Sequence, residues 1–286
     1  MIQSNKKPHI FDYVIFGSGA AGSTLANELS VNNTVALIDI SKKKNSDNID
    51  RSVPSFINKF SKNYTPTTSG VFGGNTELWS GKTYLITEEE VKEWPIKHSE
   101  LYKYSQILAE DLNICHDDIF SIEKIDNQAS YHKSQRNVLG NLFECFNLEF
   151  NQNVKCFENS SLKNIFLEEN RIVKINIEKD KKTQEIHINN SLILCCGGLG
   201  NIPIYRKCLE HIIPITELPN SYKLSDHPHF LIGKIDSQYL TRIRKGYLKN
   251  NLKDKNEECI LVFGKSTNYA FQIDGYKVGI NFFLNL

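Results

Sequence analysis

The chain has 286 residues, with 34 basic and 33 acidic side chains and a formal net charge of +1. This balance excludes a general nucleic-acid-binding surface, and the sequence contains neither an apolar stretch of membrane-spanning length nor the apolar region of a signal peptide. Its seven cysteines are scattered without C-x-x-C spacing, so we expect a cytoplasmic protein with reduced thiols, no metal site, no nucleic-acid partner and no membrane span.

The first predicted element is an apolar strand at residues 12–16 that runs into a glycine turn and a helix. Gly17, Gly19 and Gly22 match the spacing G-x-G-x-x-G, and apolar residues at helical spacing follow them. The first glycine allows a tight turn, the second lets the backbone approach a diphosphate, and the third lets the helix pack closely on the strand. The combination predicts a dinucleotide-binding turn rather than an ordinary strand–helix connection.

A second apolar strand at residues 34–40 carries Asp39, twenty residues after Gly19. A carboxylate in this place can accept hydrogen bonds from the ribose hydroxyls of an adenosine and would repel a 2′-phosphate. The two strands alone leave open whether the dinucleotide is NAD or FAD.

The next segment departs from the pattern of a nicotinamide dehydrogenase, which would continue with alternating strands and helices. Residues 41–75 are rich in Ser, Asn, Lys, Thr and Gly, so we predict a long excursion, and long excursions are usually functional. A helix is predicted at residues 99–112, with Ser99 at its start.

The later half predicts a β region that begins with a strand at residues 154–157. Strands at residues 162–167, 171–177 and 184–188 are joined by links too short for parallel crossovers, so they are expected to form an antiparallel meander.

A separate apolar strand is predicted at residues 191–196. It ends at Gly197, and a helix follows with Pro203 in its first turn, where proline is tolerated. The adjacent Cys195 and Cys196 are interpreted as core residues of this strand rather than as a redox pair.

Four segments resemble the glucose-methanol-choline (GMC) oxidoreductases. They are "VFGGNTELWSG" (71–81), "EWPIKHSELYKYSQILAEDLNI" (93–114), "SLILCCGGLGNIPI" (191–204) and "LSDHPH" (224–229). The resemblance implies a mixed α/β fold in which a Rossmann-like FAD-binding domain with a β-meander spans residues 1–220, including an excursion at 41–150. Residues 221–286 would then begin an antiparallel-sheet substrate domain.

The same resemblance implies noncovalent FAD, because Leu78 stands where some relatives carry a histidine that links to the flavin. Carried over by position, the resemblance implies that the pyrophosphate is held by Gly17, Ser18, Gly19, Ala21 and Gly22 and the ribose by Asp39. It implies that Gly73, Gly74 and Thr76 border the flavin and that Leu162 meets the adenine. Gly197 would belong to the second glycine turn of the cofactor site.

For function, the resemblance implies oxidation of an alcohol or sugar CH–OH group by hydride transfer to the flavin. The catalytic base of the family is a histidine from a C-terminal motif that this sequence does not contain, so no catalytic residue is assigned. We expect a truncated or split chain, inactive alone and completed by a complementary C-terminal chain. Its last segment, residues 269–286, is expected to leave an exposed apolar sheet edge.

Two other functions stay open from the sequence. One is an NAD-dependent dehydrogenase, and the other is a non-catalytic flavin-binding remnant.

Overall fold

The computed structural model describes residues 8–42, 69–77, 79, 82–83, 88, 91–92, 94–112, 122–124, 129–136, 140–217, 225–226, 229–234, 259–264, 269–274, 277–282 and 284–285. The chain divides into two compact units. Unit 1 comprises residues 1–79 and 140–222, and unit 2 comprises residues 80–139 and 223–286.

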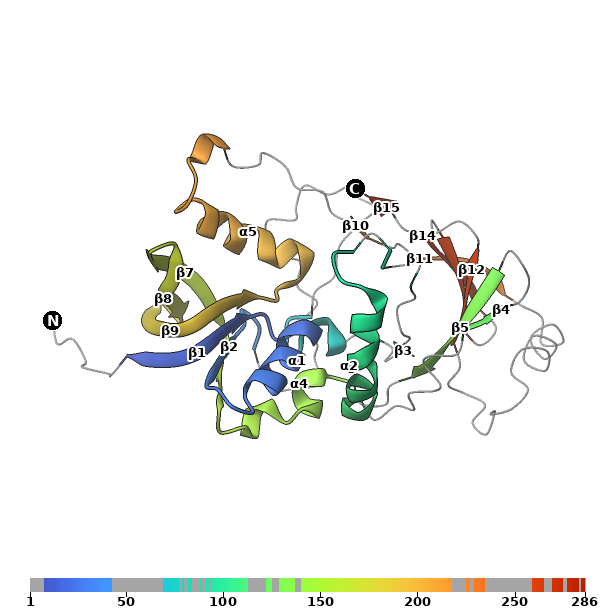
Figure 1. Ribbon diagram of the computed structural model, residues 1–286, viewed down its shortest axis with the longest axis horizontal. Helices are drawn as coiled ribbons and strands as arrows, with labels where there is room; N and C mark the ends of the chain where they lie inside the picture. The colour runs from blue at the N-terminus through green and yellow to red at the C-terminus, as the bar shows by residue number, and fades with distance from the viewer. Residues whose placement is uncertain are drawn as a thin grey trace. The chain divides into compact units, whose positions relative to one another are not determined.

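Unit 1 is built on a six-stranded sheet in the order β6-β2-β1-β9-β8-β7 (Figure 1). Strands β6, β2, β1 and β9 are parallel, whereas β9, β8 and β7 are antiparallel. In chain order the elements of unit 1 are β1 (His9–Phe16), α1 (Ala20–Leu29), β2 (Val35–Ile38), η2 (Gly74–Glu77), α4 (Leu142–Cys145), η3 (Leu148–Phe150), β6 (Val154–Phe157), β7 (Ser160–Glu168), β8 (Arg171–Lys179), β9 (Lys182–Leu194), α5 (Gly197–Leu209) and η4 (Ile215–Glu217).

This sheet confirms the predicted fold class, a mixed α/β fold with a Rossmann-like sheet and a β-meander. Strand β1 pairs with β2 in parallel, and helix α1 connects the two strands along the chain. Strands β7, β8 and β9 form the predicted antiparallel meander, because links of a few residues can join only antiparallel neighbours.

Strand β9 corrects the predicted boundary between residues 184–188 and 191–196. The two segments form one continuous strand that pairs with β8 and β1, with a register irregularity opposite Phe11 and Tyr13. The strand ends at Leu194, and α5 begins at Gly197. Pro203 therefore lies in the second turn of the helix rather than the first.

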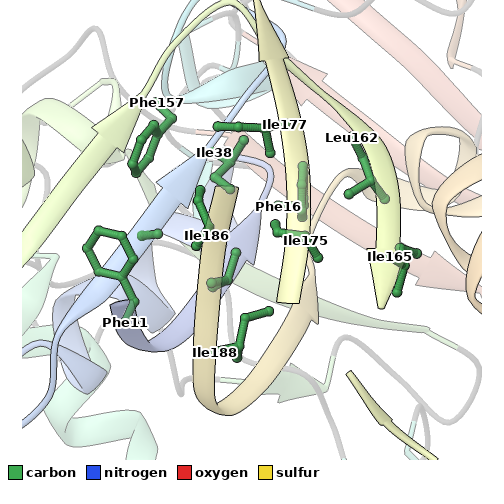
Figure 2. Close-up of a cluster of buried hydrophobic side chains, with 12 residues drawn as sticks. Phe11, Phe16, Ile38, Phe157, Leu162, Ile165, Ile175, Ile177, Ile186 and Ile188 are labelled. Carbon is green, nitrogen blue, oxygen red and sulfur yellow. The ribbon is translucent and has the colours of Figure 1, made fainter. Parts of the chain in front are cut away.

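The core of unit 1 lies on both faces of the sheet because side chains alternate along its strands. On β1, Val14 and Phe16 join one buried cluster, whereas Ile15 joins the other. Figure 2 shows the first cluster, in which isoleucines of the meander meet Phe11 and Phe157. The second cluster contains Phe72 and Phe143, whose rings pack edge to face.

Unit 2 contains α2 (His98–Asp111), which the sequence predicted with a slightly different start. Its N-cap is Lys97, so Ser99 lies inside the helix and does not cap it. The buried side of the helix carries Ser105 and Ala109, whereas the apolar side chain of Tyr104 is 67% exposed. Leu101 and Leu108 are half-buried and Leu112 is buried, so the apolar positions indicated both the helix and, apart from Tyr104, its buried face.

The strands of unit 2 form a larger sheet in the order β11-β14-β13-β12-β5-β3, with β4 paired to β5, and a small sheet of β10 and β15. Their bounds are β3 (Lys82–Thr83), β4 (Ile122–Lys124), β5 (Ala129–Arg136), β10 (Ser225–Asp226), β11 (His229–Lys234), β12 (Cys259–Gly264), β13 (Tyr269–Asp274), β14 (Lys277–Phe282) and β15 (Leu284–Asn285).

The prediction that residues 269–286 leave an exposed sheet edge is wrong for β13 and β14, each of which pairs on both sides. Strand β14 pairs with β13 on one side and with β11 on the other, and β15 pairs with β10. These apolar strands find partners in earlier segments of the chain, which the local sequence does not indicate.

Asp12 gives the sheet of unit 1 a pH-dependent contact. Hydrogen bonds from the Asn189 side chain and from the N–H and hydroxyl of Thr34 lower the pKa of this carboxyl. A carboxyl whose pKa is lowered by folding stabilises the folded state at pH values above its unfolded pKa of about 3.9. This stabilisation is lost as the pH falls through the pKa of the folded state. We expect Asp12→Asn to lower the free energy of unfolding at pH 7, with a difference from wild type that shrinks below about pH 4. Urea unfolding of the wild type and of Asp12→Asn at pH 7 and below about pH 4 measures this difference. An equal difference at the two pH values would contradict the prediction.

Candidate functional site

The candidate site lies at the carboxyl ends of β1, β2 and β9, where open α/β sheets bind their ligands (Figure 1). Gly17 follows β1 and its N–H donates to the carbonyl of Ile38 at 2.8 Å. Cys195 follows β9 and its N–H donates to the carbonyl of Phe16 at 2.6 Å. The strand pairing thus brings the first glycine turn, the end of β2 and the second glycine turn together.

Each glycine of G-x-G-x-x-G stands in a different environment. Gly17 has a φ of +97°, and a Cβ there would collide with the carbonyl oxygen of Cys195. A Cβ on Gly22 would collide with the carbonyl oxygen of Gly17, so helix and strand pack without a gap. A Cβ on Gly19 would meet nothing within 4 Å, and no side chain caps α1. The turn therefore presents open space and uncapped N–H groups at its second glycine.

Asp39 directly follows β2, is half-buried, and binds the glycine turn. Its Oδ2 accepts hydrogen bonds from the N–H and the hydroxyl of Ser18, each at 2.7 Å, and its Oδ1 accepts one from the N–H of Ser41 at 2.8 Å. A carboxylate has about four acceptor positions, so three bonds leave one for a ligand hydroxyl.

The segment 73–77 lies against the same turn. The N–H of Gly73 donates to the Ser18 hydroxyl at 2.9 Å, and a Cβ on Gly74 would lie 2.9 Å from the Cα of Gly19. Thr76 is buried and its hydroxyl donates to the carbonyl of Gly73. The structure thus brings together residues that the sequence separates by 55 positions.

Asn141 supports this segment and was not identified from the sequence. Its side chain donates to the carbonyl of Phe72 at 2.7 Å and to Glu77 at 2.9 Å, and it fills the space that a Cβ on Gly73 would need. Asn141 also caps α4, accepting from the N–H of Phe143 at 3.0 Å. The available signal was an asparagine followed three residues later by Glu144, a pattern typical of helix starts.

Trp79 contributes a further contact at the place where the chain leaves unit 1. Its indole N–H donates to the carbonyl of Gly140, where the chain returns, at 2.7 Å. The bond therefore joins the two points at which the chain leaves unit 1 and returns to it.

The other three sequence-predicted site residues are placed as follows. Ala21 lies exposed in the first turn of α1. Gly197 begins α5 with a φ of +71°. Leu162 lies in β7 with a buried side chain, and its carbonyl accepts a hydrogen bond from the Lys207 ammonium at 3.0 Å.

The cysteines beside the site are poorly suited to thiolate chemistry. Burial, aided by the negative charge of Asp39, raises the pKa of Cys196 to about 12, and burial also raises the pKa of Cys195. Both pack against buried apolar clusters. Their thiols therefore stay protonated at neutral pH.

Within the described part of the chain, no three His, Cys, Asp or Glu side chains are grouped to hold a metal ion. None of the helices described there has the length and apolar character needed to cross a bilayer. Leu78, on which noncovalent binding depends, and His227, in the segment 224–229, lie outside the described residues.

The comparisons with known proteins find similarity in structure only. No protein-family model and no curated protein matches the sequence. A formate oxidase structure matches with a TM-score of 0.56 and 12% identity, covering 98% of this chain and 73% of that one. Pyridoxine 4-oxidase from Mesorbium loti matches with a TM-score of 0.55 and 11% identity, covering 95% and 70%.

A variant of formate oxidase from Aspergillus oryzae, studied for its effect on FAD modification, has a TM-score of 0.55 and 12% identity and covers 98% and 73%. At these identities the similarity establishes the fold.

Proposed function

We propose that unit 1 binds FAD noncovalently and that the chain is part of a GMC-type oxidoreductase acting on the CH–OH group of an alcohol or sugar. The observation that carries the proposal is the convergence of the glycine turn, Asp39 and the segment 73–77 at one edge of the sheet, with open space at Gly19. The fold shared with two oxidases is consistent with it.

The residues of the turn fit a dinucleotide. The diphosphate would lie over Gly19, where no Cβ blocks the approach and the uncapped start of α1 presents N–H groups and a positive dipole end. The ribose would lie at Asp39, which keeps one acceptor position. No carboxylate lies in the first turn of α1 to repel the diphosphate.

Two features favour FAD over NAD. The antiparallel strands β7 and β8 stand where a nicotinamide dehydrogenase would place further parallel strands with crossover helices. The segment 73–77 packs on the diphosphate turn itself, which suits a residue run that borders the flavin.

Bound FAD would supply the acceptor for a hydride from the substrate carbon. The residues of this chain would orient it, through the N–H groups at the start of α1, the Asp39 carboxylate and the backbone of Gly73 and Gly74. Thr76 and Asn141 hold that backbone in place from behind. No residue of this chain is assigned as the catalytic base. The cytoplasm remains the expected location of the protein.

Asp39→Ala is expected to weaken FAD binding by about 1.5–3 kcal/mol, the usual range for a hydrogen bond to a charged group. This corresponds to roughly a 10- to 150-fold rise in Kd, measured by titration calorimetry. Asp12→Ala is the matched control, because it also removes a carboxylate with three accepted hydrogen bonds. It lies four residues before the end of β1, roughly 13 Å from the turn. Equal losses in both variants would contradict the assignment of the ribose to Asp39.

The chain alone is expected not to reduce bound FAD with an alcohol, because hydride transfer needs a positioned base. The test is anaerobic bleaching of the flavin by primary alcohols, secondary alcohols and aldoses. Clear bleaching would contradict the expectation and would make His227 the first histidine to replace.

A further inference from the structure

Ser18 lies between the two halves of the proposed cofactor site. Its side chain is fully buried, and its hydroxyl makes two hydrogen bonds of opposite sense. It donates to Asp39 Oδ2 at 2.7 Å and accepts from the N–H of Gly73 at 2.9 Å.

The chemistry of the partners fixes these roles. A carboxylate only accepts and a backbone amide only donates, so the single hydroxyl proton must point to Asp39 and a lone pair must point to Gly73. One hydroxyl thus joins the ribose end of the site to the segment that would border the flavin.

The segment behind Gly73 is fixed through the same residue. Thr76 donates to the Gly73 carbonyl and accepts from the N–H of Leu142 at 3.2 Å, so order at Gly73 extends through η2 into α4. Hydrogen-bond chains of this kind strengthen one another when buried.

We propose that Ser18 is a positioning residue that couples occupancy of the ribose position to the order of the segment 73–77. The proposal rests on the proposed FAD site. A ribose hydroxyl on Asp39 immobilises the carboxylate, the immobilised carboxylate holds the Ser18 proton, and the Ser18 lone pair stays aligned with the Gly73 N–H. The adenosine half of the cofactor thereby prepares the segment that receives the flavin half.

The test is amide hydrogen exchange of the full chain with and without saturating ADP, a probe that has the adenosine diphosphate but no flavin. Calorimetry confirms saturation of each variant. In wild type, ADP should slow exchange at residues 73–77 by about fivefold or more, the lower end of typical coupling between sites. In Ser18→Ala, ADP should bind without this slowing, and Gly73 should exchange faster even without ADP.

Ser23→Ala is the matched control. Its hydroxyl is buried in the same turn and donates to the Ser18 carbonyl at 2.6 Å, but it lies outside the path from Asp39 to Gly73. ADP should slow exchange in this variant as in wild type. If Ser18→Ala does not fold, Ser18→Cys replaces it, because a thiol is a weak donor and acceptor.

The outcomes separate the two proposals. ADP that binds wild type without slowing exchange at 73–77 overturns the coupling and leaves the dinucleotide site intact. Slowing that persists undiminished in the Ser18 variant also overturns it, because ADP would then act on the segment directly. Failure of ADP to bind wild type overturns the proposed site and the coupling together.

Discussion

Gly17→Ala is expected to lower the free energy of unfolding by about 4 kcal/mol. Two costs add at this position. A non-glycine residue at the observed φ of +97° is strained by about 1–3 kcal/mol, and the new Cβ meets the Cys195 carbonyl, an overpacking cost of about 1–3 kcal/mol. The backbone at Gly17 and at Cys195 cannot shift easily to relieve this contact. The N–H of Cys195 donates to the carbonyl of Phe16, and the N–H of Gly17 donates to the carbonyl of Ile38. Urea unfolding measures the difference.

Gly140→Ala is the control for conformational strain without collision. Gly140 has a φ of +70°, but a Cβ there meets nothing within 4 Å. Gly140→Ala should therefore lower the free energy of unfolding only by the backbone strain of about 1–3 kcal/mol. A Gly17 variant that loses no more than the Gly140 variant would show that the two glycine turns do not pack as described.

Gly19→Ala is expected to separate folding from cofactor binding. The Cβ would project into open space, and Gly19 has a φ of −66°, which alanine adopts readily. Alanine is a poorer N-cap than glycine, so the free energy of unfolding should fall by less than about 1 kcal/mol. The same Cβ occupies the space proposed for the diphosphate and should weaken FAD binding by about 2–3 kcal/mol, or roughly 30- to 150-fold in Kd.

The measurement is FAD titration of Gly19→Ala beside wild type, with unfolding curves of both. Unchanged FAD affinity in a folded Gly19 variant would mean that the diphosphate does not approach the turn there.

The sequence predicted the features of unit 1 that local chemistry determines. In the glycine turn, Gly17 has a φ that favours glycine and Gly22 leaves no room for a Cβ. The meander follows from links too short for a crossover. The position of Asp39 beside the turn follows from parallel pairing of β1 with β2.

Features that depend on distant contacts were not predictable in this way. The hydroxyl of Ser18 is committed to Asp39 and Gly73, a role that the pattern G-x-G-x-x-G does not indicate. The partners of β14 lie in β11 and β13, so this strand is not the exposed edge that its apolar residues predict. Likewise, Ser99 is a good capping residue by type, but α2 begins one residue earlier, after Lys97.

Uptake of FAD by the purified full chain tests most directly whether unit 1 binds FAD. The chain is incubated with FAD or NAD, passed through gel filtration and examined by absorbance, then precipitated with acid. We expect about one FAD and no NAD to stay with the folded protein, and acid to release the flavin into the supernatant. A folded chain that retains no FAD, or that retains NAD instead, would contradict this expectation.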